Sequence, residues 1–235
     1  MKDQIQVIEG FCPTETCARI LRELFDRRHL WEDRSLSGKP LYRNGHWYTL
    51  GASIYMDLTS PESLAAFAQK TEYFNYIMRS VFHGFYTCFI VNFQESLPGS
   101  NVQFLNDVHD LSPLPGFHIF PPEETLQAPF GKVHTDIQWQ ALERLPNFPF
   151  PNGEKTHFTF TLPLVMPYQG GGMLIPMEKG EGMEFYFYEE GNLYIHSGQF
   201  PHQVLPLRAP VTPLDWRITF QGHGFTIDNK TYLYW

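Results

Sequence analysis

Short runs of aromatic and β-branched residues, separated by glycine and proline, restrict the fold of this 235-residue chain more than any other feature. Such runs are typical of β-strands, because these side chains pack well on a pleated surface, whereas glycine and proline mark turns. The runs predict strands at residues 86–93, 116–120, 156–164, 185–188, 193–196 and 216–220. The chain from residue 86 onward is therefore expected to be all-β.

One of these runs also indicates which side of its strand is buried. In it, Phe158, Phe160 and Leu162 alternate with Thr159 and Thr161. Successive side chains of a strand point to opposite faces of the sheet. The pattern therefore predicts a strand whose aromatic and aliphatic face packs on a core.

Two segments before residue 86 have the spacing of amphipathic helices. After Pro13, apolar residues recur at helical spacing, and the pattern ends near Trp31. Ser60, Pro61 and Glu62 provide a cap, a first-turn proline and an early acidic residue, which together mark the start of a second helix. The expected apolar face of this second helix consists of Leu64, Phe67, Ala68, Tyr73, Ile77 and Val81. We therefore expect two helices in the N-terminal third.

Composition and element order together suggest the architecture. Apolar residues make up 43% of the chain and charged residues 18%, so there is ample material for a core. We expect one domain over residues 1–235, with a helical part at about 1–85 and a β core at about 86–235, although the length also permits two small domains. Helices outside a β-sandwich or barrel are the simplest arrangement. Two long proline-bearing connections, 96–115 and 141–153, have the length of functional lids or disordered segments, and their aromatic residues favour a lid.

The charge pattern argues against two classes of partner. The net charge is −8 and the Lys and Arg residues are scattered, so the basic surface that grips a phosphate backbone is missing and no nucleic acid partner is expected. No stretch of about 18 apolar residues and no signal-peptide-like start occurs, so we expect a soluble cytoplasmic protein without a membrane partner. Cys12, Cys17 and Cys88 lack the spacing of a zinc or redox motif and are expected to be thiols. The oligomeric state is left open.

A His-x-Asp pair at His134 and Asp136 is the first candidate for chemistry. On an extended segment, residues two apart point to the same side, so the imidazole and the carboxylate can share a metal ion. Further along, a predicted strand and a Gly-Pro bend lead into His202. Two neutral imidazoles and one carboxylate leave three positions of an iron(II) ion open for other ligands.

An Arg-x-Thr pair follows these motifs. Arg217 lies on the predicted strand at 216–220, and Thr219 lies two residues beyond it, on the same face. The planar guanidinium matches both oxygens of a carboxylate, which an ammonium group does not do.

In this order, the His-x-Asp pair, the distant histidine and the Arg-x-Thr pair resemble the iron(II)- and 2-oxoglutarate-dependent oxygenases, over roughly residues 116–225. The resemblance implies a double-stranded β-helix (jelly-roll) core with the N-terminal α-helices packed on one sheet. It also implies that His134, Asp136 and His202 hold Fe(II), and that Arg217 and Thr219 bind the remote carboxylate of the cosubstrate 2-oxoglutarate. Dioxygen is the second cosubstrate, and the products are succinate and an oxidised, usually hydroxylated, substrate.

Two positions in this assignment have competitors. His196 ends the predicted strand at 193–196 and competes with His202, which the bend before it and the apolar residues after it favour as the ligand. His196 is then a core histidine or a donor to a ligand. Arg208 competes with Arg217, but a proline-flanked loop is a poor platform for a rigid fork, so Arg217 is preferred.

Aromatic residues near the metal motif are candidates for the substrate pocket. Trp139 follows the His-x-Asp pair, and Phe148 lies in the second long connection. Ordinary packing explains both equally well, because aromatic residues are abundant in this chain. His118 and Gln138 are within possible reach of the cosubstrate or substrate, and the sequence does not decide between these roles.

The function that follows is oxidation of an unactivated C–H bond in a small molecule, such as a free amino acid or a biosynthetic intermediate. The resemblance makes hydroxylation the usual outcome and disfavours halogenation, because Asp136 is retained; desaturation, ring closure and epoxidation stay open. A protein side chain is the nearest variant of the substrate. The alternatives are a cupin-like metalloenzyme that does not use 2-oxoglutarate and a non-catalytic jelly-roll binding protein.

Overall fold

Two β-sheets and a set of helices make up the part of the chain that the computed structural model describes, residues 5–35, 46–123, 127, 130–150, 155–177, 182–207 and 211–235. The larger sheet has the order β1-β10-β7-β12-β5-β3-β2, and β13 joins β12 to β4. The smaller sheet has the order β6-β11-β8-β9. Nearly all the pairings are antiparallel, with β4 and β13 parallel to each other.

The element bounds are as follows. The larger sheet contains β1 (Ile5–Ile8), β2 (Glu32–Asp33), β3 (Tyr48–Leu50), β4 (Asn101–Phe104), β5 (Gly116–Phe120), β7 (Thr156–Val165), β10 (Leu193–His196), β12 (Arg217–Ile227) and β13 (Lys230–Tyr234). The smaller sheet contains β6 (Phe130–His134), β8 (Met173–Pro176), β9 (Met183–Tyr186) and β11 (His202–Val204). The helices are α1 (Thr14–Asp26), α2 (Ile54–Asp57), α3 (Leu64–Val81), α4 (His83–Ser96) and α5 (Trp139–Leu142), with short 3-10 turns at Arg28–Leu30, Pro61–Ser63 and Leu105–Asp107.

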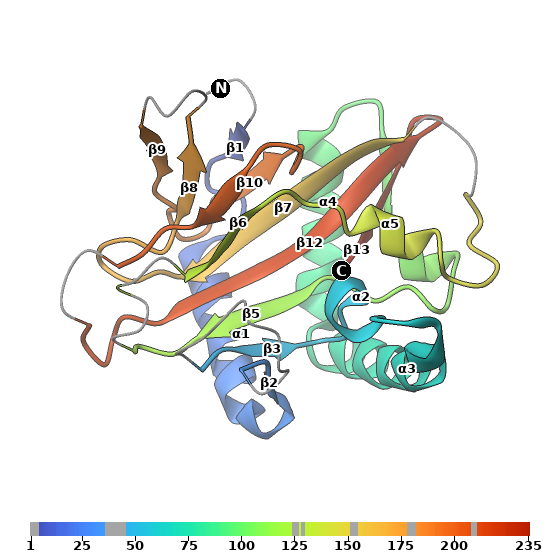
Figure 1. Ribbon diagram of the computed structural model, residues 1–235, viewed down its shortest axis with the longest axis horizontal. Coiled ribbons are helices and arrows are strands. Elements are labelled where there is room, and N and C mark those ends of the chain that lie inside the picture. The colour runs from blue at the N-terminus through green and yellow to red at the C-terminus, as the bar shows by residue number, and fades with distance from the viewer. Residues whose placement is uncertain are drawn as a thin grey trace.

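Helices α1, α3 and α4 cover one face of the larger sheet, and the smaller sheet lies on its other side (Figure 1). Phe89 of α4 contacts Phe160 of β7 and Phe220 of β12, with ring centroids 5.4 and 5.0 Å apart. These rings belong to a core cluster that also includes Ile20 and Leu24 of α1. The helical layer therefore packs on the sheet through the apolar sides of β7 and β12, as the alternation in β7 predicted.

The opposite face of the same strands is polar and, apart from the half-buried Gln221, buried. On β7 it presents Thr159 and Thr161, and on β12 it presents Arg217, Thr219, Gln221 and His223 at every second position. Both faces are covered because the smaller sheet lies over this one. A polar interior between two sheets is the space in which a site can form.

The prediction of a strand at residues 86–93 is wrong, because α4 occupies this segment. Phe85, Phe89 and Phe93 follow one another at intervals of four, which aligns them on one side of a helix, and all three are buried against the sheet. Their packing outweighs the strand preference of isolated aromatic and branched residues. The helical region therefore continues past residue 85, to Ser96.

Most other predicted elements are confirmed with shifted ends. The strands expected at 116–120, 156–164 and 193–196 are β5, β7 and β10, whereas β12 continues well beyond residue 220. The first helix ends at Asp26, and the second begins after a capping box between Ser60 and Ser63. The buried face of α3 holds Phe67, Thr71, Phe74, Asn75 and Met78, so the predicted face shares only Phe67 with it, and Tyr73 is half exposed.

The two long connections are packed rather than open where the structure describes them. The first contains β4, which pairs with β13, so it is not a lid. In the second, Phe148 and Phe150 pack against Phe225 near the end of β12. All three cysteines carry free thiols, as predicted.

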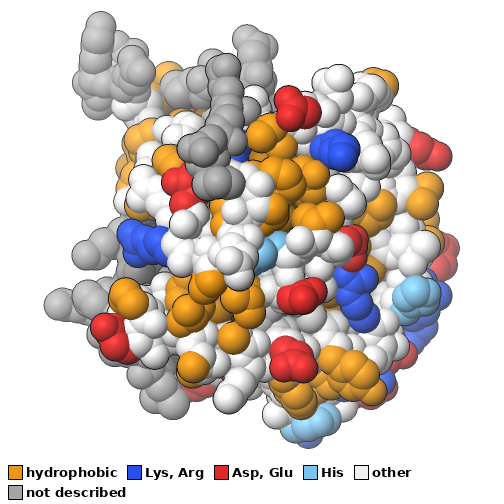
Figure 2. Space-filling view, turned by 90° about the vertical axis from the view of Figure 1, so that its right-hand side faces the viewer, with side chains coloured by type: hydrophobic (Ala, Val, Ile, Leu, Met, Phe, Trp, Pro, Cys, Tyr) orange, Lys and Arg blue, Asp and Glu red, His pale blue; other side chains and the backbone are white. Residues whose placement is uncertain are grey.

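The surface agrees with the scattered charge of the sequence. On the face drawn in Figure 2, Lys and Arg side chains stand apart from one another among acidic and hydrophobic ones. None of the helices in the described part of the chain combines the length and the apolar composition that a membrane span requires.

Candidate metal centre

His134, Asp136 and His202 converge on one point between the two sheets. His134 ends β6 and His202 begins β11, and the two residues face each other across the antiparallel pair. The Nε2 atom of His134 lies 3.8 Å from Oδ1 of Asp136, and Nε2 of His202 lies 3.7 Å from Oδ2. One ligand atom from each residue lies within 4.8 Å of the other two. The strand pairing thus brings together two motifs that are 66 residues apart in the sequence, from 136 to 202.

The backbone and the neighbouring side chains fix the carboxylate of Asp136. Its N–H donates to the carbonyl oxygen of Gly198 at 2.8 Å, Thr159 donates to Oδ2 at 2.5 Å, and Gln138 donates to Oδ1 at 3.2 Å. Burial acts to raise the pKa of Asp136, but the imidazoles of His223 and His202 and the Thr159 hydroxyl outweigh it, so the pKa lies below its usual value. Asp136 is therefore an anion at neutral pH.

Glycine at position 198 allows this close approach. Gly198 has φ of +69°, and a Cβ atom there would lie 2.6 Å from the Cβ and 2.8 Å from Oδ2 of Asp136. Any side chain would push against the carboxylate. The Gly-Pro bend noted in the sequence is therefore part of the site.

The imidazole of His202 is held with one nitrogen aimed at the same point. Its Nδ1 donates to the carbonyl oxygen of Phe200 at 3.0 Å, which leaves the lone pair on Nε2, the atom that faces Asp136. Burial lowers the pKa of His202, which favours this neutral form. His134 is the exposed member of the set. An anionic carboxylate and imidazole nitrogens on one side of a point fit a divalent transition-metal ion such as iron(II).

His196 lies next to this set without joining it. Its Nδ1 accepts a hydrogen bond from the N–H of Gly198 at 3.1 Å, and its ring centroid is 5.2 Å from that of His202. Burial, with the neighbouring His202, lowers its pKa to about 3. The ligand set within 4.8 Å contains His202 and not His196, which supports the assignment made from the sequence.

A further histidine of the site, His223, was missed by sequence reasoning. Because Asp136 is an anion, Thr159 donates to it, and the Thr159 oxygen accepts from Nδ1 of His223 at 3.0 Å. Burial lowers the pKa of His223 to about 4, in keeping with a neutral ring. The signal was present in the sequence, since His223 shares the strand face of Arg217.

Arg217 is buried in the same cavity at the start of β12. Its Nε donates to the carbonyl oxygen of Gly171 at 2.6 Å, and its guanidinium lies 5.0 Å from the centroid of the Phe120 ring. The Gly171 carbonyl group, just before β8, therefore positions the arginine. Thr219 is fully buried on the same strand face, and its hydroxyl donates to Oε1 of Gln221 at 3.3 Å. Arg208 lies outside the described residues.

A cavity of about 640 Å³ is lined by the three candidate metal ligands and Arg217. His118 and Gln138 line it, as do Tyr55 and Tyr188, which the sequence did not single out. Tyr188 is buried, which raises its pKa to about 12.

Trp139 and Phe148, the proposed pocket residues, are not part of this lining. Trp139 stacks on His157 with ring centroids 5.0 Å apart, and Phe148 packs in a hydrophobic cluster with Leu142 and Leu145. Both side chains pack around α5 and do not face the cavity. The sequence alone does not show in which direction they point.

The sequence matches no family model and no curated protein. Among solved structures, an N-substituted L-amino acid dioxygenase from Burkholderia ambifaria AMMD is 13% identical, with a TM-score of 0.50 over 77% of this chain and 76% of that one. A 2OG-Fe(II) oxygenase family oxidoreductase from Burkholderia pseudomallei is 11% identical, with a TM-score of 0.49 over 96% and 85%. A Pseudomonas putida prolyl-4-hydroxylase is 15% identical, with a TM-score of 0.43 over 94% and 91%. The chain therefore shares its fold with the amino acid dioxygenase.

Proposed function

We propose that this chain is an iron(II)- and 2-oxoglutarate-dependent oxygenase that oxidises an unactivated C–H bond of a small molecule, usually by hydroxylation. The observation that carries the proposal is the convergence of His134, Asp136 and His202 within a cavity that also holds a buried arginine. A structural neighbour is named for its action on N-substituted L-amino acids, and we extend a small-molecule substrate of this kind to this chain.

Each residue of the site has a distinct task in this proposal. Asp136 supplies the negative charge, and His134 and His202 supply neutral nitrogens, so the three together hold a divalent iron ion and leave one side of it open. When bound, the ion, 2-oxoglutarate and dioxygen supply the oxidising power. Halogenating oxygenases have a small residue in place of this carboxylate, which leaves room for chloride, so Asp136 favours hydroxylation over halogenation.

Arg217 holds the far end of the cosubstrate. The guanidinium is a planar double donor, and Nε is already anchored to Gly171, so the group cannot turn away. Phe120 covers one face of it, and Trp47 stacks on Phe120 with ring centroids 5.6 Å apart. These rings exclude water from the arginine, which strengthens its attraction for a carboxylate.

A buried arginine in the metal cavity also separates this proposal from its rivals. A cupin-like enzyme that does not use 2-oxoglutarate does not require a fixed arginine that binds a carboxylate. A non-catalytic binding protein does not require a metal ion with free coordination positions. The arrangement of Arg217 and the three ligands therefore favours the oxygenase.

Formation of succinate from 2-oxoglutarate tests the proposal. The protein, supplied with iron(II) and oxygen, should convert 2-oxoglutarate to succinate, and Asp136→Ala should abolish this turnover because two imidazoles alone hold iron(II) weakly. Asp110→Ala, which removes an exposed carboxylate that does not line the cavity, is the matched control and should keep full activity. Full turnover by the Asp136 variant would remove this residue from the site.

A further inference from the structure

The cavity extends beyond the metal ligands to a chamber between α2 and α5. Tyr55, Leu58 and Thr59 line it from the side of α2, and Ala141 and Arg144 line it from the side of α5. The two short helices lie near each other, close to the C-terminus (Figure 1). Arg217 and His223 both face the cavity from β12, and Arg217 lies at the start of the strand, away from His223. This chamber is therefore the part of the cavity left for a substrate.

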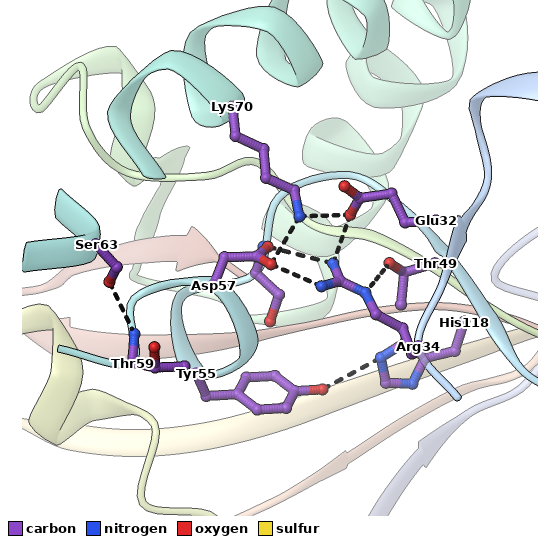
Figure 3. Close-up of polar contacts among 10 residues, drawn as sticks. Glu32, Arg34, Thr49, Tyr55, Asp57, Thr59, Ser63, Lys70 and His118 are labelled. Carbon is purple, nitrogen blue, oxygen red and sulfur yellow. Dashed lines mark hydrogen bonds and ion pairs between the residues drawn. The ribbon is translucent and has the colours of Figure 1, made fainter. Parts of the chain in front are cut away.

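The α2 side of the chamber is held rigidly (Figure 3). Arg34 forms two hydrogen bonds with Asp57, at 2.6 and 3.2 Å, and Lys70 bonds the same carboxylate at 2.7 Å. Desolvation acts to raise the pKa of Asp57, but Arg34 and then Lys70 outweigh it and hold the pKa below its usual value. The carboxylate is thus charged and fixed by two cations.

These hydrogen bonds and ion pairs set the position of the residues that face the chamber. The hydroxyl of Tyr55 lies 3.2 Å from Nε2 of His118, and the N–H of Thr59 donates to the Ser63 hydroxyl at 3.1 Å (Figure 3). Because these hydrogen bonds hold residues at both ends of α2, this side of the chamber keeps its shape when a ligand binds. Such preorganisation lowers the entropic cost of binding. The chamber has the properties of a preformed pocket.

The charges around the cavity are unequal. Among the described lining residues, Asp136 is the one carboxylate, and Arg144 and Arg217 are the two permanent cations. In the proposed function, the charges of the ion and Arg217 balance those of Asp136 and the dicarboxylate cosubstrate. Arg144 is then left over. Its neighbour Glu143 is 3.2 Å from Lys155, so that carboxylate is already engaged elsewhere.

We propose that the substrate carries a carboxylate and that Arg144, exposed at the α5 side of the chamber, binds it. This inference rests on the proposed function and adds the substrate's charge to it. A cationic substrate would find no acidic side chain among the described residues of the lining other than the metal ligand. An arginine with a planar fork suits a carboxylate, and its place at the opening lets it draw anions toward the metal centre.

The test uses the protein loaded with zinc(II), which is redox-inert, and with saturating 2-oxoglutarate, so that the arginine at the other end is occupied. The probes are 4-methylpentanoate and 3-phenylpropanoate, each compared with its primary amide, and binding is measured by saturation-transfer NMR. We expect each carboxylate to bind at least about tenfold more tightly than its amide. Arg144→Gln should remove this difference. Arg22→Gln, which removes an exposed arginine on α1 that does not line the cavity, should preserve it.

Three results would overturn the inference. In the first, the carboxylates bind no better than the amides, or do not bind at all. In the second, the Arg144→Gln protein keeps the preference for carboxylates. In the third, the probes weaken the binding of 2-oxoglutarate and so occupy its place. Calorimetric titration of the zinc-loaded protein with 2-oxoglutarate separates the two proposals. If 2-oxoglutarate does not bind, the proposed function fails, whereas if it binds and the carboxylate preference is missing, only the inference about Arg144 fails.

Discussion

Replacing Gly198 with alanine should weaken metal binding far more than it weakens the fold. A Cβ atom at this position would lie 2.6 Å from the Cβ of Asp136, so the two must separate by about 0.8 Å to reach the 3.4 Å of ordinary contact. Metal–ligand distances tolerate about 0.2 Å. We therefore expect the affinity for iron(II) to fall at least about tenfold, roughly 1.4 kcal/mol.

Gly10→Ala is the matched control for this change. Gly10 has φ of +62°, close to the +69° of Gly198, but a Cβ atom there would have no neighbour within 4 Å. Both variants should therefore lose about 1 kcal/mol of stability from the left-handed backbone, a fall of about 2–4 °C in Tm. Thermal denaturation measures this shared cost, and anaerobic titration with iron(II) measures the affinity. If both variants bound iron(II) like the unmodified protein, the contact between Gly198 and Asp136 would have no bearing on the site.

Two further predictions concern the neighbours of the metal ligands. Arg217→Lys keeps the charge but loses the planar double donor of the guanidinium, so the apparent affinity for 2-oxoglutarate, measured by turnover, should fall about tenfold or more. Arg208→Lys should change this affinity little. The reverse result would assign the carboxylate-binding role to Arg208. Thr159→Val removes the hydroxyl that donates to Asp136 and should lower iron(II) affinity about 10- to 100-fold in the same anaerobic titration. Thr226→Val, whose hydroxyl contacts Thr231 instead, is its control, and equal affinities of the two variants would contradict the role of Thr159.

The candidate metal ligands could be predicted from the sequence because their spacing is local. His134 and Asp136 lie two residues apart on an extended segment. The Gly-Pro bend before His202 indicates that the chain turns toward the interior at this histidine. The alternation along β7 likewise marked its two faces, since a strand places neighbouring side chains on opposite sides.

What the sequence missed depends on contacts between distant segments. Tyr55 enters the cavity because Arg34 and Asp57 hold α2 in place, and no pattern around Tyr55 signals this. The run at 86–93 became a helix because its rings fit the sheet, which a propensity cannot show. Trp139 follows the metal motif closely, but its direction is set by its place on α5 against His157.

The visible charge-transfer band that iron(II) and 2-oxoglutarate give when both bind one site tests the central claim most directly. Under anaerobic conditions, the unmodified protein should develop this band on titration with iron(II) and 2-oxoglutarate. His202→Ala should not develop it even with excess iron(II), because only His134 and Asp136 would remain as ligands. His196→Ala should keep the band, with at most the 10- to 100-fold weaker binding that is typical of losing a neighbour of a ligand. A band that survives in His202→Ala and disappears in His196→Ala would show that the third ligand is His196, and no band in the unmodified protein would contradict the proposed function itself.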